Sequence, residues 1–208
     1  MALAIPRLYG VTDTRLMPGP ILSHKIAAAL AGGCGWIQYR DKTQDHARRR
    51  NEARLLLDLC EEYNAKLIIN DDVALAAATG AHGVHLGQDD MDAATARRQL
   101  GDGAIIGVTC HAQVALAVAA AQAGADYVAF GRFFNSATKP DASLASLDIL
   151  ARARQAVNLP IIAIGGIDLG NATSVLLAGA DTLAVCGALF DTPDPGEQAR
   201  RFCQLAHC

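Results

Sequence analysis

Short hydrophobic runs recur along the whole chain, and in most of them the apolar residues follow one another without alternating polar positions. The eight runs are Leu8–Asp13, Trp36–Arg40, Lys66–Asn70, Gly83–Leu86, Ile105–Thr109, Tyr127–Gly131, Ile161–Gly165 and Thr182–Cys186. A continuous apolar run is typical of a β-strand that is covered on both faces, as in a parallel sheet. The pattern therefore predicts eight buried strands.

Segments rich in Ala and Leu, with helical spacing of their apolar residues, lie between these runs. The predicted helices are Ser23–Ala31, Asp45–Tyr63, Met91–Leu100, Ala112–Ala123, Leu144–Ala156 and Asn171–Ala178. Ser23 and Asp45 are suitable N-cap residues, and Gly101 and Gly124 are suitable helix stops. Strands and helices thus alternate along the chain.

A weak internal repeat has a period of two strand–helix units. Its four copies read AGGCGW, TGAHGV, AGADYV and AGADTL, and each places a glycine shortly before an even-numbered strand. The four glycines are Gly32, Gly80, Gly124 and Gly179. We expect each of them to end a helix in the left-handed conformation and to turn the chain into the next strand.

Eight strand–helix units in one chain of 208 residues favour an α/β fold, a short (β/α)8 TIM barrel that forms one domain over residues 1–208. A doubly wound open sheet is the structural alternative. It is disfavoured because the first strand, in YGVTDTRL, is not followed by a GxGxxG phosphate-binding turn.

Composition and charge exclude several classes of protein. The net charge of −3 offers no surface for nucleic acid or another polyanion, so any anion site must be local. The chain shows no secretory signal pattern and no apolar run long enough to span a membrane. The six cysteines form no CxxC motif and fit buried positions in a reducing compartment. We therefore expect a cytoplasmic protein without membrane partners.

Polar residues concentrate at the carboxyl ends of the predicted strands, where a (β/α)8 barrel places its active site. In chain order they are Thr12, Asp13, Gln38, Arg40, Lys42, Asn70, Asp71, Asp72, Gln88, Asp89, Asp90, Thr109, His111, Arg132, Ser136, Thr138 and Lys139. The starts of the strands carry few groups of this kind. This asymmetry favours an enzyme.

The second strand ends in QYRDK, which places Gln38, Arg40 and Lys42 at alternate positions and so on one face if the strand extends that far. Two cations that face the inside of a barrel are costly unless an anion occupies the site. The alternative is a solvated strand end whose cations pair with Asp41 or Asp45. The motif alone leaves both interpretations open.

Two acidic clusters, Asn70–Asp72 and Gln88–Asp90, follow neighbouring strands. Mg²⁺ typically binds one or two carboxylates and completes its shell with water and substrate phosphates. The alternative is helix capping, because Asp72 and Asp89–Asp90 precede helical segments. Two clusters beside a basic strand end are more than capping requires, and we expect only Asp72 and Asp89 to keep that modest role.

Glycines mark the ends of the last two strands, in AIGGI and VCG. Loops after strands seven and eight of such barrels commonly bind a phosphate through backbone N–H groups, and Gly165 and Gly166 allow this close approach. One edge of the barrel therefore offers a site for a diphosphate with a metal ion and a second site for a monophosphate.

Seven motifs of the chain, in order and with matching spacing, resemble those of the thiamine-phosphate synthase family. They are QYRDK, INDD, GVHLGQDD, IGVTCH, GRFFNSATKPDA, AIGGI and LAVCGALF, and they cover roughly residues 8–200. The resemblance implies a (β/α)8 enzyme that joins hydroxymethylpyrimidine diphosphate to a thiazole phosphate and releases pyrophosphate. It also implies that Mg²⁺ is the cofactor and that the partners are small-molecule substrates.

Carried over residue by residue, the resemblance implies a diphosphate site, a metal site and a thiazole-phosphate site. The pyrimidine diphosphate would bind Gln38, Arg40, Lys42, Asn70, Thr109 and Lys139, of which Arg40, Lys42, Thr109 and Lys139 are catalytic. Asp71 and Asp90 match the Mg²⁺ ligands. The thiazole phosphate would bind Ser136, Thr138, Gly166, Cys186 and Gly187.

Three positions depart from the family pattern. Thr109 stands where the family usually has Ser, which keeps the hydroxyl group. Gly187 replaces a common Ser, so a hydroxyl donor is lost while the backbone N–H remains. Arg132 stands where many relatives have Pro, which adds a cation beside the site. None of these changes removes a catalytic group.

The mechanism that the resemblance implies is dissociative. Mg²⁺ and the side chains of Arg40, Lys42 and Lys139 stabilise the leaving pyrophosphate. The pyrimidine then carries a methylene cation, which the thiazole nitrogen captures. No side-chain nucleophile is needed. We expect His111 to orient its neighbours more than to act as a base. The rival functions are a thiazole tautomerase-like barrel, a non-catalytic thiamine-phosphate-binding regulator and a phosphate-sugar isomerase. The acidic clusters and Lys139 argue against all three rival functions. The sequence does not determine the oligomeric state and allows a homo-oligomer.

Overall fold

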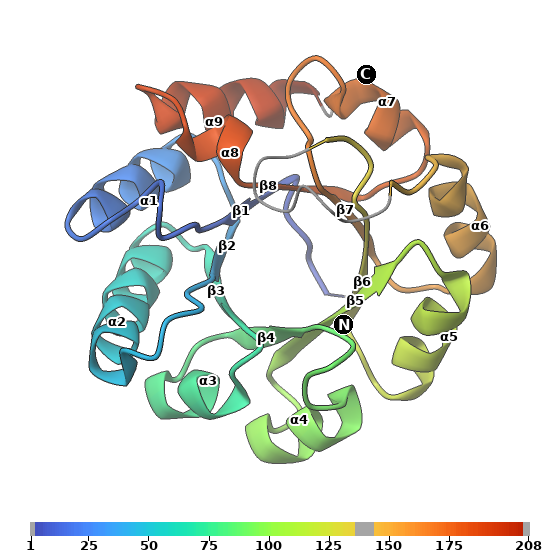
Figure 1. Ribbon diagram of the computed structural model, residues 1–208, viewed down its shortest axis with the longest axis horizontal. Coiled ribbons are helices and arrows are strands. Elements are labelled where there is room, and N and C mark those ends of the chain that lie inside the picture. The colour runs from blue at the N-terminus through green and yellow to red at the C-terminus, as the bar shows by residue number, and fades with distance from the viewer. Residues whose placement is uncertain (1–2, 136–143, 206–208) are drawn as a thin grey trace.

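A computed structural model of the chain describes residues 3–135 and 144–205 and contains a closed barrel of parallel strands in the order β1 to β8. The strands are β1 (Leu8–Val11), β2 (Trp36–Tyr39), β3 (Lys66–Asn70), β4 (Gly83–Leu86), β5 (Ile105–His111), β6 (Tyr127–Phe130), β7 (Ile161–Ile164) and β8 (Thr182–Val185). Figure 1 looks along the barrel and shows the helices as an outer ring. The predicted (β/α)8 fold is confirmed.

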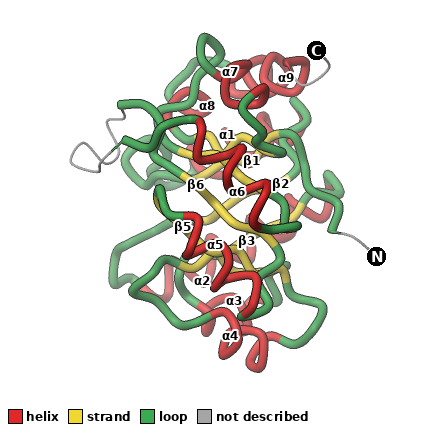
Figure 2. Tube along the Cα trace, turned by 90° about the vertical axis from the view of Figure 1, so that its right-hand side faces the viewer, coloured by secondary structure: helices red, strands yellow, loops and turns green. Residues whose placement is uncertain are grey.

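Helices follow the strands and cover the outside of the barrel, as the side view in Figure 2 shows. They are α1 (Ile21–Ala31), α2 (His46–Glu62), α3 (Val73–Thr79), α4 (Ala93–Leu100), α5 (Val114–Gln122), α6 (Asp148–Ala156), α7 (Ala172–Leu177), α8 (Gly187–Phe190) and α9 (Pro195–Gln204). The six predicted helices are all present. The sequence analysis missed α3, α8 and α9, and the first two are too short for helical periodicity to show.

Aspartates cap four of the helices, α2, α3, α4 and α9. Asp45 caps α2, as predicted, because its Oδ1 accepts the backbone N–H of Arg48 at 3.0 Å. The prediction for Ser23 is wrong, because α1 begins at Pro20 and the Ser23 hydroxyl donates to the Pro20 carbonyl within the first turn. Pro20 has the fixed φ that a helix start needs.

Two hydrophobic layers hold the barrel together. The outer layer lies between the strands and the helices, and the inner layer fills the barrel around Tyr9, Trp36 and Tyr127. The rings of Tyr9 and Trp36 meet edge to face, with their centroids 5.5 Å apart. Leu3 and Ile5 pack against this inner layer from the N-terminal segment, which crosses the ring of strands in Figure 1.

The repeated glycine motifs form turns at the end of the barrel at which the strands start. Gly80, Gly124 and Gly179 have positive φ, as predicted, but Gly32 is right-handed and Gly33 takes the positive φ of 101° instead. Gly32 lies against the backbone of α9, where an added Cβ would be 2.2 Å from the Gly196 oxygen. Close packing, not backbone conformation, therefore requires glycine at position 32.

The fourth residue of each repeat has a role that the sequence analysis missed. It contacts the start of the preceding odd-numbered strand, and we call these four contacts the strand braces. Asp126 and Asp181 each accept a strand N–H at 2.7 Å, from Ile106 and Ile161 respectively. The corresponding residues of the other copies are His82, whose Nδ1 accepts the Leu67 N–H at 3.1 Å, and Cys34, whose thiol donates to the Leu8 carbonyl.

Candidate active site at the carboxyl ends of the strands

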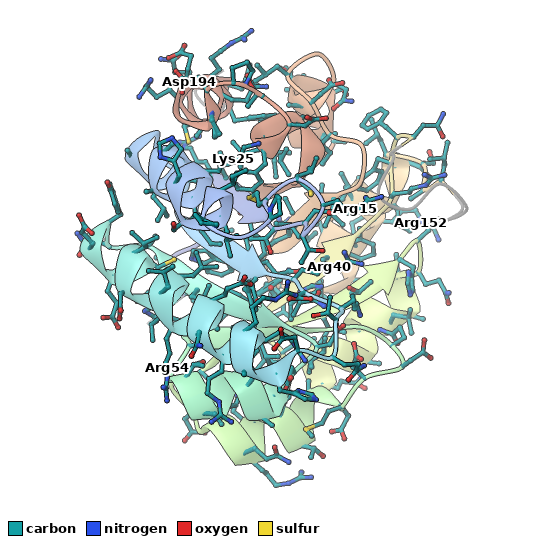
Figure 3. The ribbon with its side chains drawn as sticks, turned by 60° about the vertical axis from the view of Figure 1, so that its left-hand side comes forward. Arg15, Lys25, Arg40, Arg54, Arg152 and Asp194 are labelled. Carbon is teal, nitrogen blue, oxygen red and sulfur yellow. The ribbon has the colours of Figure 1, made fainter. Side chains whose placement is uncertain are left out.

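The carboxyl ends of the strands form one rim of the barrel, which we call the mouth. Figure 3 labels two arginines there, Arg15 after β1 and Arg40 after β2, whereas Arg54 lies on the outer helix α2. Both mouth arginines lie close enough to Asp13 to lower its pKa, Arg15 through direct hydrogen bonds and Arg40 through its charge. Two arginines therefore lie at the end of the barrel where the sequence predicts an anion, and one of them is paired with Asp13.

Gln38, Arg40 and Lys42 of QYRDK become progressively more exposed toward the mouth. Gln38 is buried in the barrel interior, Arg40 is half-buried at the mouth, and Lys42 is exposed. The Thr12 hydroxyl accepts the Arg40 backbone N–H at 2.7 Å, which holds β1 and β2 together at their carboxyl ends. The prediction that Gln38, Arg40 and Lys42 lie on one face required the strand to extend to Lys42, whereas β2 ends at Tyr39, so strand alternation does not place Arg40 and Lys42.

The alternative interpretation of QYRDK, in which Asp41 or Asp45 neutralises these cations, is wrong for the described part of the chain. Asp41 is buried on the outer side and pairs with Arg48 of α2 at 2.6 Å. Asp45 caps the same helix. Lys42 instead donates to the carboxylate of Asp71.

The two aspartates after β3 have different roles because the turn into α3 is short. Asp71 adopts a left-handed φ of 63°, which Asp tolerates better than most residues, and its backbone N–H donates to the His85 carbonyl at 2.8 Å. Its side chain points to Lys42 and Asp90. Asp72 caps α3 by accepting the Leu75 N–H at 2.8 Å, as expected.

Asp71 and Asp90 form a close carboxylate pair on neighbouring strand ends. Burial raises the pKa of Asp90, and the carboxylate of Asp71 beside it raises that pKa further. For Asp71, burial alone would raise the pKa, but hydrogen bonds from Lys42 and Asp90 outweigh it and the net pKa is lowered. Two carboxylates so close together, one with a raised pKa, fit a site for a divalent cation, whose charge would offset their mutual repulsion.

The other residues of the second acidic cluster do not cap a helix. Asp92, and not Asp89, is the N-cap of α4, so the expectation of a capping role for Asp89 is wrong. Asp89 is exposed at the mouth. Gln88 donates from Nε2 to the Thr109 carbonyl and so joins the ends of β4 and β5. Asp90 accepts the Gly87 N–H at 2.7 Å, which fixes its carboxylate toward Asp71.

The glycines after β7 lie against the loop that follows β6. Both have positive φ, 104° for Gly165 and 70° for Gly166. An added Cβ at Gly165 would meet Arg132 at 2.2 Å, and one at Gly166 would meet the Phe134 and Asn135 carbonyls at 2.6 Å. Packing between loops therefore also requires these glycines, a reason that the phosphate hypothesis did not include.

Gly187 is the first residue of α8 and follows Cys186, a half-buried residue between β8 and α8. The position of a Cβ on Gly187 is open, with no heavy atom within 4 Å among the described residues. The space that a serine side chain would fill is thus present.

Three predicted site residues, Ser136, Thr138 and Lys139, lie outside the described residues.

Sequence reasoning missed His85, which is buried inside the barrel between two predicted site elements. Its Nδ1 is 2.9 Å from the Tyr127 hydroxyl and its Nε2 is 2.8 Å from the Thr109 hydroxyl. A signal was available, because alternation within GVHL places His85 on the same face as Gly83 and opposite the apolar Val84 and Leu86. His111, by contrast, has an exposed side chain that forms no hydrogen bond with the described residues, so the expected orienting role is not seen.

The sequence matches the family model of thiamine monophosphate synthase over residues 8–189. The chain belongs to the thiamine monophosphate synthase family. It is 54% identical over 194 residues to the thiamine-phosphate synthase of Nitrosococcus oceani, covering 93% of this chain and 89% of that protein. It is 52% identical to the thiamine-phosphate synthase of Halorhodospira halophila, with 93% and 91% covered. As a member of this family the chain is a transferase of thiamine biosynthesis.

Solved structures agree with the family assignment. The thiamine phosphate pyrophosphorylase from Pyrococcus furiosus superposes with a TM-score of 0.87 at 32% identity, covering 96% of this chain and 95% of the other. A 3-hexulose-6-phosphate synthase superposes with a TM-score of 0.70 at 17% identity, over 96% and 99% of the two chains, and shows only that the fold is shared. Among the described residues of this thiamine monophosphate synthase family member, no helix is long and apolar enough to cross a membrane.

Proposed function

We propose that this thiamine-phosphate synthase joins 4-amino-5-hydroxymethyl-2-methylpyrimidine diphosphate to a thiazole phosphate, in its plain or carboxylated form, and that the reaction requires Mg²⁺. Thiamine phosphate and pyrophosphate are the products. The reaction takes place in the cytoplasm on small-molecule substrates. The observation that supports the proposal best is the contact of Lys42 with Asp71, which joins a cation to the Asp71–Asp90 carboxylate pair at the mouth.

Asp71 and Asp90 would hold the metal ion, with Asp71 fixed by its turn and Asp90 by the Gly87 N–H. When bound, Mg²⁺ supplies positive charge that offsets the charge of the diphosphate and of the leaving pyrophosphate. Two carboxylates leave most of the coordination shell to water and phosphate oxygens, which is how Mg²⁺ usually binds a diphosphate. With the charge of Asp71 offset in this way, Lys42 would be available to contact the substrate diphosphate.

The reacting bond is the one between the methylene carbon and the bridging oxygen of the diphosphate. Arg40, Lys42 and Lys139 stabilise the pyrophosphate as it leaves with the bonding electron pair. The methylene carbon becomes a cation that is conjugated with the aminopyrimidine ring. The lone pair of the thiazole nitrogen then forms the new carbon–nitrogen bond, which leaves the charge on the thiazolium ring. Gln38, Asn70 and Thr109 hold the pyrimidine so that this attack needs little movement.

The thiazole phosphate is assigned to the other half of the mouth, where β7 and β8 end. Gly166, Cys186 and Gly187 would offer backbone N–H groups to the phosphate, and the position of a Cβ on Gly187 is open. Ser136 and Thr138 belong to this site by resemblance. The two phosphorylated groups would then enter from opposite sides, with the reacting carbon and nitrogen between them.

Three neighbouring carboxylates provide the experiment. Asp71→Asn and Asp90→Asn remove metal ligands, whereas Asp89→Asn changes an exposed carboxylate next to the site and serves as the matched control. Thiamine phosphate and pyrophosphate are measured with both substrates, with and without Mg²⁺. We expect Asp71→Asn, Asp90→Asn and Lys139→Ala to lower kcat/KM at least about a hundredfold, and Asp89→Asn to change it less than about twofold.

Folding of each variant is checked by circular dichroism and thermal unfolding. The proposal is wrong if the wild-type protein forms no thiamine phosphate from these substrates. The metal assignment is wrong if Asp71→Asn and Asp90→Asn retain wild-type rates, or if product forms at the same rate in the presence of EDTA.

A further inference from the structure

A continuous series of polar groups crosses the inside of the barrel. Gln38 Nε2 donates to the Tyr9 hydroxyl at 3.0 Å, and the Tyr9 and Tyr127 hydroxyls are 3.1 Å apart. The Tyr127 hydroxyl lies 2.9 Å from His85 Nδ1, and His85 Nε2 lies 2.8 Å from the Thr109 hydroxyl. We call these five residues the interior chain. It begins and ends at residues assigned to the pyrimidine, on β2 and β5, with two strands between them.

The interior chain is buried along almost its whole length. Tyr9 and Tyr127 are at most 1% exposed, Gln38 is 4% exposed and His85 is 8% exposed. Apolar side chains such as Val11, Ile68 and Ile162 surround it within the barrel. Buried polar groups in such surroundings are costly unless every one of them is hydrogen-bonded, so each member depends on the next.

The hydrogen bonds can run in only one direction at a time. Burial raises the pKa of Tyr9 and of Tyr127 well above the usual range, so each hydroxyl keeps a single proton to donate. Tyr9 accepts from Gln38, and the Tyr127 hydroxyl is the acceptor within reach of its own proton, so we infer that Tyr9 donates to Tyr127 and that Tyr127 donates to Nδ1 of His85. His85 then carries its proton on Nε2 and donates to Thr109. The Thr109 proton is left to point into the mouth.

We propose that the interior chain gives Gln38 and Thr109 opposite hydrogen-bonding roles and so makes the site select an aminopyrimidine over an oxopyrimidine. Gln38 presents its carbonyl oxygen as an acceptor, because the amide group is held with its nitrogen turned toward Tyr9. Thr109 presents its hydroxyl proton as a donor, because accepting from His85 leaves that proton available. Tyr9, Tyr127 and His85 are positioning residues that do not contact the substrate themselves.

The chemistry of the ring explains the selectivity. An aminopyrimidine offers an amino donor next to a ring-nitrogen acceptor, which matches an acceptor at Gln38 and a donor at Thr109. In a 4-oxopyrimidine the two roles are exchanged, because a carbonyl and a ring N–H replace them. An oxopyrimidine would place its carbonyl against the Gln38 carbonyl and its ring N–H against the Thr109 hydroxyl proton, two mismatched hydrogen-bonding pairs. To match it, every hydrogen bond of the interior chain would have to reverse its direction at once. This inference rests on the proposed function, because that function places the pyrimidine between these two residues.

Tyr127→Phe tests the proposal, because it removes one hydroxyl at the centre of the interior chain and keeps the ring. Tyr39→Phe is the matched control: its hydroxyl is also buried but donates to Glu52 at 2.6 Å outside the barrel interior. Binding is measured by calorimetry with Mg²⁺, using amino- and oxopyrimidine diphosphate analogues in which CH2 replaces the ester oxygen. These analogues cannot react, so the measurement is independent of turnover.

We expect the wild-type protein and Tyr39→Phe to bind the amino analogue at least about tenfold more tightly than the oxo analogue. In Tyr127→Phe the preference should fall to about threefold or less, because His85 can then change its tautomer and Thr109 can accept. KM for the pyrimidine diphosphate should rise about five- to tenfold, with KM for the thiazole phosphate unchanged.

The tautomer of His85 is read directly from ¹⁵N chemical shifts of histidine-labelled protein, with the signals assigned by comparison with His85→Gln. We expect the Nε2–H form in the wild-type protein and a mixture in Tyr127→Phe. An Nδ1–H form in the wild-type protein, or an unchanged analogue preference in Tyr127→Phe, overturns the inference while leaving the proposed function intact. A wild-type protein that binds neither analogue contradicts the proposed function instead.

Discussion

Gly107 in β5 is predicted to be among the least replaceable residues of the barrel. A Cβ at this position would lie 1.9 Å from Cζ and 2.3 Å from the hydroxyl oxygen of Tyr127. The Tyr127 ring is fully buried and packs against Trp36 with a centroid distance of 5.4 Å, so it has no free space to enter. In Gly107→Ala the ring must therefore move and give up its hydrogen bonds to Tyr9 and His85.

The expected cost follows from these contacts. Overpacking of a filled interior costs about 1–3 kcal/mol, and the two hydrogen bonds contribute about 1 kcal/mol each. The free energy of unfolding should thus fall by roughly 3–5 kcal/mol, which for a chain of this size lowers Tm by roughly 6–20 °C. Urea and thermal unfolding measure both quantities. Gly103→Ala is the control, because nothing lies within 4 Å of its Cβ, and it should change stability by less than about 0.5 kcal/mol.

A double variant separates this clash from a general intolerance of β5. In Gly107→Ala with Tyr127→Leu the ring that meets the new methyl group is gone, so the two losses should be far from additive. If Gly107→Ala is as stable as Gly103→Ala, or if the two losses add, the close packing of Gly107 against Tyr127 does not limit the stability of the barrel and the prediction is refuted.

Two other substitutions test the mouth and the opposite end. Gly187→Ser introduces a hydroxyl group in an open position. We expect KM for the thiazole phosphate to fall about three- to fivefold, with kcat unchanged. A rise of this KM in steady-state kinetics would contradict the prediction. Burial lowers the pKa of His82, so its unfolded form takes up a proton at higher pH than the folded form. The free energy of unfolding of the wild-type protein should therefore exceed that of His82→Asn by its full amount above pH about 6.5, and by less as the pH falls below that value. Urea unfolding measures this difference. A difference that is constant between pH 7.5 and 5 would rule the prediction out.

The fold was largely predictable because its signal is repeated eight times in sequence. Continuous apolar runs are a direct consequence of burial on both faces, and the closed barrel has a strand at each of them. Helix boundaries were harder to predict. Ser23 is an acceptable N-cap by residue type, but Pro20 lies one turn earlier and begins α1. Nothing in the local sequence shows which of two suitable residues the tertiary packing selects.

The candidate site was predictable to the extent that residue type determines the role. Cations and carboxylates at strand ends indicate a Mg²⁺–diphosphate site, and the contact of Lys42 with Asp71 agrees with it. The role of Asp89 was not predictable, because Asp92 caps α4 three residues later and either aspartate suits that position. His85 was missed because its importance depends on Tyr127, which lies on a strand 42 residues further along the chain.

The four strand braces have a consequence for how the barrel is assembled. Each brace joins an odd-numbered strand to the turn before the next strand, and its partners are between 15 and 26 residues apart in sequence. Every quarter of the ring is thus secured by contacts that a short loop can form quickly. The pairing of β8 with β1, where Leu183 meets Leu8, and the packing of α9 against α1 have to bring the two ends of the chain together. The late, slow event in folding is then expected at the junction of β1 and β8, which is also the neighbourhood of Gly187 at the mouth.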